Sequence, residues 1–325
     1  LMSFKPAAVE FIDAPTLESS KNNVEQNANR SWIDGNPSAV LIIEFFNDNK
    51  NQLNDIVSKC KVWLKLNQSY SCSEIDFDDY KKVWSVRKAG LGLLMGNPGP
   101  RKALAVIEDA ALPLRYMYDY YRDVKKIISY YNIEAVYYGH ASVGLIHIRP
   151  KLDLSIDKDR RVMENIAKDV SKIVKKYKGS LSGEHGDGRI RAPYLEEQFG
   201  EEVYQLLVNL KNKFDSKNLL NPGVIIGNSP ITKNLKSVAQ INNDIKTAYD
   251  WTDDVSFFYA AEKCNGAGVC RKSSGNGVMC PSYQATRVEE YSTRGRANLL
   301  RRALNSKEPL KALNNNELRI ALDLC

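Results

Sequence analysis

Residues 134–150 have the sequence EAVYYGHASVGLIHIRP, which predicts two short strands separated by a sharp break. The strand-forming residues are interrupted at 142–144, where a serine and a glycine are typical of a turn. Such a break can reverse or bulge the chain. His140 and His147 stand on either side of it and can then point at one place, although a single straight strand would send them to opposite faces.

The other segments of the chain carry helix and strand patterns in mixed order. Without a strict alternation of strand and helix, this order favours an α+β fold with an antiparallel sheet and covering helices. Apolar runs predict buried strands at 39–46 and 103–108, and a Gly/Pro-rich loop is expected at 90–99. Apolar residues at helical spacing predict helices at 51–66, 113–131, 157–177 and about 194–214.

The residue composition and the predicted secondary structure change after Gly227. Residues 228–248 are polar and predict a linker, whereas residues 249–325 carry helical patterns with few strand signals. We therefore expect a first domain over 1–227 and a second, mainly α-helical domain over 249–325. Because the chain starts without Met and stops at Cys325 directly after a helix-like run, we expect a fragment that is incomplete at both ends.

The bulk composition is that of a soluble globular protein, with 43% hydrophobic and 26% charged residues among 325. The net charge of +7 comes from lysines and arginines spread along the chain, which favours a solvated basic surface over nucleic-acid binding. No apolar run is long enough to span a membrane, and the N-terminus lacks the pattern of a signal peptide. We expect a cytoplasmic protein; peripheral attachment to the inner membrane and formation of a homo-oligomer stay open.

All three histidines of the chain lie between residues 140 and 185, next to glycines or close to them. Glycine lets the backbone approach a ligand closely. His140, His147 and Glu184 offer two imidazoles and a carboxylate, which with an open fourth position make a catalytic zinc set, and related ligation suits manganese or iron. The alternative is two packed histidines and an exposed loop carboxylate that bind no metal.

Three of the six cysteines cluster, and a Cys-Pro pair closes the cluster. Cys264, Cys270 and Cys280 lie in a glycine-rich run without a nearby histidine, and Cys280 precedes Pro281 as in ferredoxin-type [4Fe–4S] sites. The glycines that free backbone N–H groups to face the sulfides are Gly266, Gly268, Gly275 and Gly277. A structural zinc site is the alternative, although such a site usually has four protein ligands and only three cysteines cluster here. Cys60 falls on an apolar helical face and is expected in the core.

The motifs GHASVGLIHIRP (139–150), SGEHGDGRIRAPYL (182–195) and NPG (221–223) occur in this order. Together they resemble the C-terminal domain of FAD-linked oxidases, the family of D-lactate, D-2-hydroxyglutarate and glycolate dehydrogenases. The resemblance covers roughly residues 1–227. It implies an antiparallel sheet with helices, arranged as a ferredoxin-like cap.

The resemblance also implies roles for individual residues. The two histidines and the glutamate named above would bind a divalent metal (zinc, manganese or iron) that holds the carboxylate and hydroxyl of the substrate. His185 would be the base that takes the hydroxyl proton. Arg87, in the run WSVR, matches the position of the family's substrate-binding arginine, and Lys102 is a weaker candidate for that contact. The alternative for Arg87 and for Lys102 is an exposed surface position without a role in substrate binding.

The segment 264–304 resembles the iron–sulfur half of large fused FAD/iron–sulfur dehydrogenases of the YdiJ type. In two-cluster ferredoxins, the cysteine before proline serves the other cluster. Cys264 and Cys270 would then bind one [4Fe–4S] cluster, and Cys280 would bind a second one together with Cys325. This implies a ferredoxin-type domain in the second part of the chain.

We therefore expect an FAD-dependent D-2-hydroxy-acid dehydrogenase of the D-2-hydroxyglutarate, D-lactate or glycolate type. The substrate hydride would pass to FAD, because no side chain accepts one, and electrons would go on to iron–sulfur clusters and then to a quinone or a carrier protein. The family binds FAD mainly through an N-terminal domain that is missing here, so the fragment alone is expected to be inactive. The alternative is a non-catalytic iron–sulfur or metal-binding electron-transfer protein.

Overall fold

The chain divides into two units, and all of the sheet except Lys102 lies in the first. The computed structural model describes residues 1–235, 245–273 and 280–325. The first unit comprises Leu1–Leu91, Ala103–Leu152 and Ile156–Leu235, and the second comprises Gly92–Lys102, Asp153–Ser155 and Lys236–Cys325. Residues 236–244 of the predicted linker, and the glycines Gly275 and Gly277, lie outside the described residues.

Six strands form one sheet in the order β2-β1-β5-β6-β3, and β4 pairs with β6 outside this path. The strands are β1 Ala8–Asp13, β2 Ala39–Glu44, β3 Lys102–Ala103, β4 Ala110–Ala111, β5 Ala135–His140 and β6 Leu145–Leu152. β1 pairs antiparallel with β2 and β5, and β6 pairs antiparallel with β5 and β4. Glu10 stands opposite His140, and Tyr138 stands opposite His147. The predicted α+β architecture with an antiparallel sheet is confirmed.

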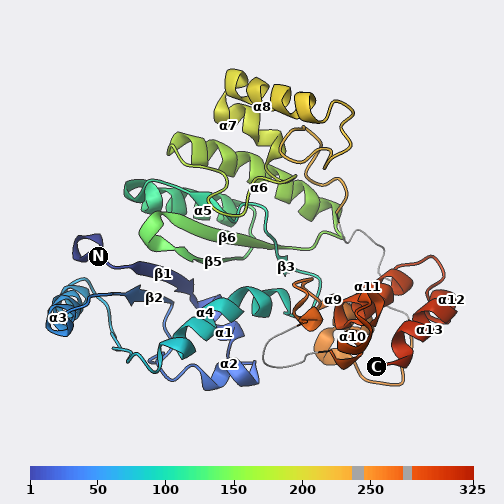
Figure 1. Cartoon of the computed structure of the whole chain (residues 1–325), viewed down its shortest axis with the longest axis horizontal. Helices are drawn as coiled ribbons and strands as arrows, with labels where there is room; N and C mark the ends of the chain where they lie inside the picture. The colour runs from blue at the N-terminus through green and yellow to red at the C-terminus, as the bar shows by residue number, and fades with distance from the viewer. Residues whose placement is uncertain (236–244, 274–279) are drawn as a thin grey trace. The chain divides into compact units, whose positions relative to one another are not determined.

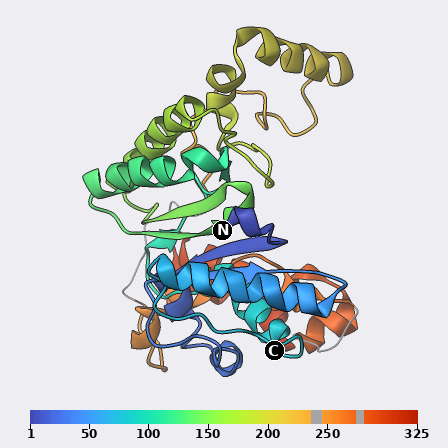
Figure 2. The same ribbon diagram turned by 90° about the vertical axis from the view of Figure 1, so that its left-hand side faces the viewer.

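Helices α5 Met117–Tyr130 and α6 Asp157–Lys176 lie side by side along β5 and β6 (Figure 1), and the second view shows the same arrangement (Figure 2). Both helices bury an apolar stripe at helical spacing. The buried apolar residues are Tyr120, Val124 and Ile128 on α5, and Val162, Met163, Ile166, Ala167, Val170 and Val174 on α6. With Ile148 from β6, these side chains form an apolar core of the first unit.

The other helices of the first unit are α1 Ala14–Ser19, α2 Val24–Ala28, α3 Lys50–Leu66, α7 Leu195–Phe199 and α8 Glu201–Phe214, and α4 Tyr80–Met95 continues into the second unit. The helices predicted at 51–66, 113–131 and 157–177 are confirmed, and Cys60 is buried as expected. The predicted break is also confirmed, because the 3-10 helix η3 Ala141–Val143 and Gly144 connect β5 to β6. Within the described ranges, no helix has both the length and the apolar character needed to cross a membrane.

Two predicted strands differ from the structure. The run 39–46 forms β2, but β2 is not buried, and Leu41 is 43% exposed. The reason is that β2 ends the described sheet and has only β1 beside it. The run 103–108 contributes only Ala103 to a strand, although Val106 and Ile107 are buried. Apolar runs of this length do not determine whether the residues form a strand or another kind of secondary structure.

Two predictions differ from the structure at glycine residues. Residues 90–95 are not a loop, because α4 continues through them. Gly90 is a packing position there, since an added Cβ would lie 2.9 Å from Cγ2 of Thr16. The helix predicted at 194–214 is broken at Gly200, whose φ of 85° separates α7 from α8. Glycine thus marks close packing at the first position and a chain turn at the second.

In the second unit, the described residues from 245 onward form helices and no strand. The helices are α9 Phe257–Glu262, α10 Pro281–Thr286, α11 Thr293–Leu304, α12 Pro309–Leu313 and α13 Asn316–Asp323, with 3-10 helices η5 Thr252–Asp254, η6 Val269–Arg271 and η7 Glu289–Tyr291. Phe258, Tyr259, Ala261 and Leu304 form a buried apolar core. The ferredoxin-type character of this part stays a prediction.

We predict that Gly144→Ala lowers the free energy of unfolding by about 2–4 kcal/mol. Gly144 has a φ of 75°, and an added Cβ would lie 1.9 Å from the carbonyl oxygen of Leu112. Gly35→Ala is the control, because its φ of 62° is similar but the nearest atom, Oη of Tyr70, is 3.7 Å away. This control should cost only about 1 kcal/mol. Urea denaturation compares the two variants, and equal losses would contradict the close approach at Gly144.

Candidate functional site

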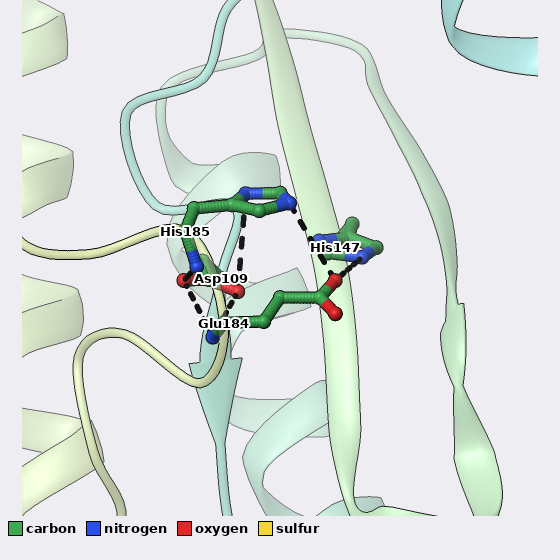
Figure 3. Close-up of side chains that lie close together, drawn as sticks. All are labelled: Asp109, His147, Glu184 and His185. Atoms are coloured by element: carbon green, nitrogen blue, oxygen red, sulfur yellow. Dashed lines mark hydrogen bonds and ion pairs between the residues drawn. The ribbon is translucent and has the colours of Figure 1, made fainter.

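Three imidazoles point at a single carboxylate oxygen. Oε1 of Glu184 lies 3.2 Å from Nε2 of His140 and 3.3 Å from Nε2 of His147. Nε2 of His185 lies 3.5 Å from the same oxygen. Figure 3 shows the side chain of Glu184 reaching from its loop toward His147, with the ring of His185 beside it. The structure therefore brings together the three residues proposed as metal ligands and the residue proposed as the base.

The strand break and the sheet register position the first two histidines. β5 ends at His140, η3 turns the chain, and β6 carries His147 back along the same strand pair. The two rings lie at a centroid distance of 5.6 Å. Glu184 and His185 come from the loop after α6, far along the sequence. The site thus depends on tertiary contacts that hold this loop against the sheet.

Each of the three imidazoles is held at Nδ1 by an oxygen atom that accepts hydrogen bonds. Nδ1 of His140 lies 2.7 Å from Oε1 of Glu10, and Nδ1 of His147 lies 2.6 Å from the carbonyl oxygen of Glu108. Nδ1 of His185 lies 2.8 Å from Oε1 of Glu108. A carbonyl oxygen or an ionised carboxylate can only accept a hydrogen bond, so Nδ1 carries the ring proton and donates, which leaves the lone pair of a neutral ring on Nε2.

Glu108 is the buried carboxylate around which these side chains gather. Its Oε1 lies 3.4 Å from Nη2 of Arg191, and its Oε2 lies 3.4 Å from Nη2 of Arg149. Burial alone would raise the pKa of Glu108, but hydrogen bonds from His147 and His185 and the charge of Arg149 lower the pKa to about 2. The group is therefore an anion at neutral pH, and it accepts from the histidines rather than donating to them.

Asp109 fixes the loop that carries Glu184 and His185. Its side chain is fully buried, and its Oδ2 lies 2.8 Å from the backbone nitrogen of His185 and 3.2 Å from that of Glu184. Oγ of Ser182 donates to the same oxygen at 2.5 Å. Figure 3 shows Asp109 against the loop backbone, with its contacts to Glu184 and His185 drawn. Several donors on one buried carboxylate leave the loop little freedom.

The facing atoms of the site all carry lone pairs. Three Nε2 atoms and a carboxylate oxygen repel one another unless a cation or a proton lies between them. Ligand atoms bound to one ion at about 2.0–2.2 Å lie about 2.8–3.6 Å apart, and the contacts of His140 and His147 with Glu184 fall in this range. The donor set therefore fits a divalent metal ion.

A second combination of side chains offers ligand atoms near the same place. Asp109, His147, Glu184 and His185 have ligand atoms that all lie within 4.8 Å of one another. The oxygens of Asp109 already accept hydrogen bonds from the loop, which weakens this group as a ligand. Metal binding by His140, His147 and Glu184 stays a prediction.

The sequence interpretation missed the residues that stand behind the histidines. Glu10 lies in the middle of the apolar strand β1, and Glu108 and Asp109 directly follow the apolar run 103–107. An acidic residue inside an apolar run, or at its end, is the signal that could have found them. A buried acid needs partners, and those partners tend to be functional groups.

The two candidates for binding the substrate carboxylate have different surroundings. Arg87 on α4 donates from Nε and Nη2 to Oε2 of Glu10, at 2.9 and 2.8 Å, and so belongs to the group that holds His140. Lys102, in the second unit, donates from Nζ to the carbonyl oxygen of Asn97 at 2.6 Å. Desolvation lowers the pKa of Lys102. Substrate binding by either cation stays a prediction.

Cys264 and Cys270 lie on one glycine-rich turn of the second unit. Cys264 follows α9 and is half-buried, and Cys270 is buried in η6. Nη1 of Arg294 on α11 donates to the carbonyl oxygen of Gly266, between the two cysteines, at 3.0 Å. Gly266 and Gly268 have φ values of 79° and 74°, which glycine adopts without strain.

Cys280 has different neighbours. It is buried at the N-cap of α10, and its Sγ lies 3.8 Å from Nη1 of Arg296 on α11. Burial alone would raise the pKa of the Cys280 thiol, but hydrogen bonds from Ser282 and from nearby backbone groups lower the pKa to about 7. Cys325 is exposed after α13. In the described ranges, no three thiols lie close enough together to share one zinc ion.

We predict that Glu108→Gln lowers the free energy of unfolding by about 3–5 kcal/mol. The amide matches the carboxylate in size but leaves Arg149 and Arg191 buried without their shared anion. Asp55→Asn is the control, because its ion pair with Lys59 is exposed and should contribute at most about 0.5 kcal/mol. Urea denaturation measures both variants. A loss for Glu108→Gln no larger than that of the control would mean that the site does not depend on this carboxylate.

Over most of its length, the chain is similar to two bacterial D-2-hydroxyglutarate dehydrogenases. It is 30% identical to the one from Pseudomonas putida, over 93% of this chain and 31% of that protein. It is 28% identical to the one from Haemophilus influenzae, over 90% of this chain and 30% of that protein. A D-lactate dehydrogenase from Archaeoglobus fulgidus is 26% identical, over 68% of this chain and 46% of that protein. The chain thus spans about 30% of the length of the two D-2-hydroxyglutarate dehydrogenases.

A family match covers the part of the chain that carries the histidine site. The family described as FAD linked oxidases, C-terminal domain, matches residues 2–225. These residues include all of the sheet, all three histidines and the carboxylates that orient them. The chain therefore belongs to the family of FAD linked oxidases, C-terminal domain.

Proposed function

We propose that this chain carries the metal and substrate site of an FAD-dependent D-2-hydroxy-acid dehydrogenase that acts on D-2-hydroxyglutarate. The observation that carries the proposal is the convergence of Nε2 of His140 and of His147 on Oε1 of Glu184, at 3.2 and 3.3 Å. Two imidazoles and a carboxylate beside an open position suit a catalytic divalent ion, and zinc, manganese and iron all fit such nitrogen and oxygen ligands.

A divalent ion held by these three ligands would lower the pKa of a substrate hydroxyl bound next to it. Other side chains of this chain orient the ligand histidines. Glu10 and Glu108 accept from the Nδ1 atoms of the ligand histidines, which fixes their tautomers and raises the basicity of Nε2. The charge of Arg149 favours the ionised form of Glu108, whose carboxylate lies beside Nδ1 of His147 and of His185.

His185 is the residue that would take the hydroxyl proton. Nδ1 of His185 donates a hydrogen bond to Oε1 of Glu108 at 2.8 Å, so the lone pair lies on Nε2. The same carboxylate would stabilise the imidazolium formed after proton transfer. The ring stacks on His147 with an interplanar angle of 8°, which fixes its orientation. The side chain is 43% exposed, so a substrate can reach it.

The oxidation also needs a hydride acceptor. FAD, bound mainly by another part of the protein, would supply that acceptor, which no side chain can replace. Removing a hydride from carbon and a proton from oxygen turns the 2-hydroxy acid into a 2-oxo acid. The electrons would then leave singly through iron–sulfur clusters to a quinone or a carrier protein.

The placement of the cysteines supports the iron–sulfur part of the proposal. Cys264 and Cys270 share one glycine-rich turn, whereas Cys280 lies beside Arg296. These separate surroundings favour two [4Fe–4S] clusters, with Cys325 as a further ligand of the second. The second unit would then be a ferredoxin-type domain fused to the dehydrogenase.

The similarity to known proteins favours D-2-hydroxyglutarate over D-lactate and glycolate. The two D-2-hydroxyglutarate dehydrogenases match 93% and 90% of this chain, whereas the D-lactate dehydrogenase matches 68%. The longer match includes residues of the cysteine-containing unit. A dicarboxylate also needs a cation for its second carboxylate, and Arg87 and Lys102 are the candidates.

We predict that metal loss and base loss can be separated in the full-length protein. Glu184→Gln should remove the bound metal and the activity together, because it weakens a ligand. His185→Ala should keep the metal and lower kcat by about 10²–10⁴, because it removes only the base. Metal analysis and anaerobic flavin reduction by D-2-hydroxyglutarate measure the two effects. Wild-type turnover in His185→Ala would refute the role of the base, and Glu74→Gln, which changes an exposed ion pair with Lys61, should change neither readout.

We also predict that kcat/KM for D-2-hydroxyglutarate exceeds that for D-lactate by at least about tenfold, because a second charge-assisted carboxylate contact is worth about 1.5–3 kcal/mol. Chelation should abolish both activities, and added zinc or manganese should restore them. If the protein binds metal but none of the three hydroxy acids reduces its flavin, the non-catalytic electron-transfer alternative is correct.

A further inference from the structure

Arg296 is a buried guanidinium without a carboxylate partner among the described residues. It lies on α11 and is 5% exposed. Its Nε donates to the carbonyl oxygen of Ala321 at 2.7 Å, and its Nη1 donates to Oγ of Ser282 at 2.9 Å. Nη2 is buried and has no hydrogen-bond partner in the described part of the chain. One end of this cation therefore lacks an acceptor.

A buried charge without a counter-charge is unfavourable by several kcal/mol, so this position calls for an anion. Arg301, on the same helix and 7% exposed, illustrates the usual solution. Its Nη2 lies 3.3 Å from Oε1 of Glu262. Arg296 has instead the sulfur of Cys280, 3.8 Å from Nη1.

The contacts of Arg296 also join the two proposed ligands of the second cluster. Through Ser282, it contacts the turn that carries Cys280, since the hydroxyl of Ser282 donates to the carbonyl oxygen of Tyr291 at 2.7 Å and lies 3.4 Å from Sγ of Cys280. Through Ala321, it contacts α13, the helix that leads to Cys325. The guanidinium therefore lies beside the sulfur of Cys280 and contacts the helix that precedes Cys325.

We infer that Arg296 is the counter-ion of an iron–sulfur cluster bound through Cys280 and that it raises the reduction potential of this cluster. The inference rests on the proposed iron–sulfur function of the second unit. A thiolate-ligated cluster is anionic, and reduction adds an electron to it. A positive charge and an N–H donor beside the ligand sulfur stabilise the reduced state more than the oxidised state.

The test is a redox titration of the full-length protein after anaerobic reconstitution with ferrous iron and sulfide, followed by EPR. Arg296→Gln should keep iron and sulfide bound but lower the equilibrium constant for reduction of one cluster about tenfold, because a charge-assisted hydrogen bond is lost. For one electron, this change corresponds to about 59 mV. Arg301→Gln is the matched control, since it removes a buried guanidinium of the same helix whose partner is Glu262. It should lower the melting temperature and leave both potentials unchanged.

If Arg296→Gln does not fold, Arg296→Lys, which keeps the charge, tests whether Arg296 affects the reduction potential. A smaller downward shift in this variant supports the inference, because the ammonium cannot reproduce the hydrogen bonds of the guanidinium. Unchanged potentials in a folded Arg296 variant overturn the inference and leave the proposed function intact. A wild-type protein that takes up no iron and sulfide overturns both. Equal shifts in the Arg296 and Arg301 variants would mean that only the stability of α11 is at work, and they also overturn it.

Discussion

The buried carboxylate of Glu108 is the interaction on which the histidine site depends. It interacts with two histidines and two arginines, drawn from β6 and from the segment after α6. A single anion thus joins the sheet to the loop that carries Glu184. Because the anion is buried, its attraction for these groups is weakly screened by solvent. Its backbone carbonyl adds a contact to His147 that does not depend on charge.

Buried charge is balanced differently around the histidine site and around Arg296. In the first unit, anion and cation are both present, as in the ion pair of Glu10 with Arg87 and the contacts of Glu108 with its arginines. In the second unit, Arg296 has backbone and hydroxyl acceptors and a thiol beside it, but no carboxylate among the described residues. The first arrangement holds side chains in place for a ligand that is positive. The second leaves a buried cation without an anion among the described residues.

The parts of the fold that the sequence predicts well have long, regular patterns. Helices α5 and α6 and the strand pair β5 and β6 follow from apolar spacing and from the break between the strands. Short apolar runs and single glycines are ambiguous, because the same letters suit a buried turn, an edge strand or a close helix contact. The histidines and Glu184 stand out through their glycine-flanked motifs. Glu10 and Arg296 do not, because their partners come from remote segments and no local pattern specifies them.

The contact between Glu10 and His140 shows how an ordinary core residue can determine site geometry. In the pairing of β1 with β5, Glu10 stands opposite His140, and Ile12 stands opposite Tyr138. Side chains alternate along a strand, so Glu10 and Ile12 share one face. Ile12 is 1% exposed, and a shift of the pairing by one residue would move Ile12 and Glu10 to the opposite face of the sheet. The burial of Ile12 therefore holds the register in which Glu10 accepts from Nδ1 of His140, and that contact leaves the lone pair of Nε2 facing Glu184.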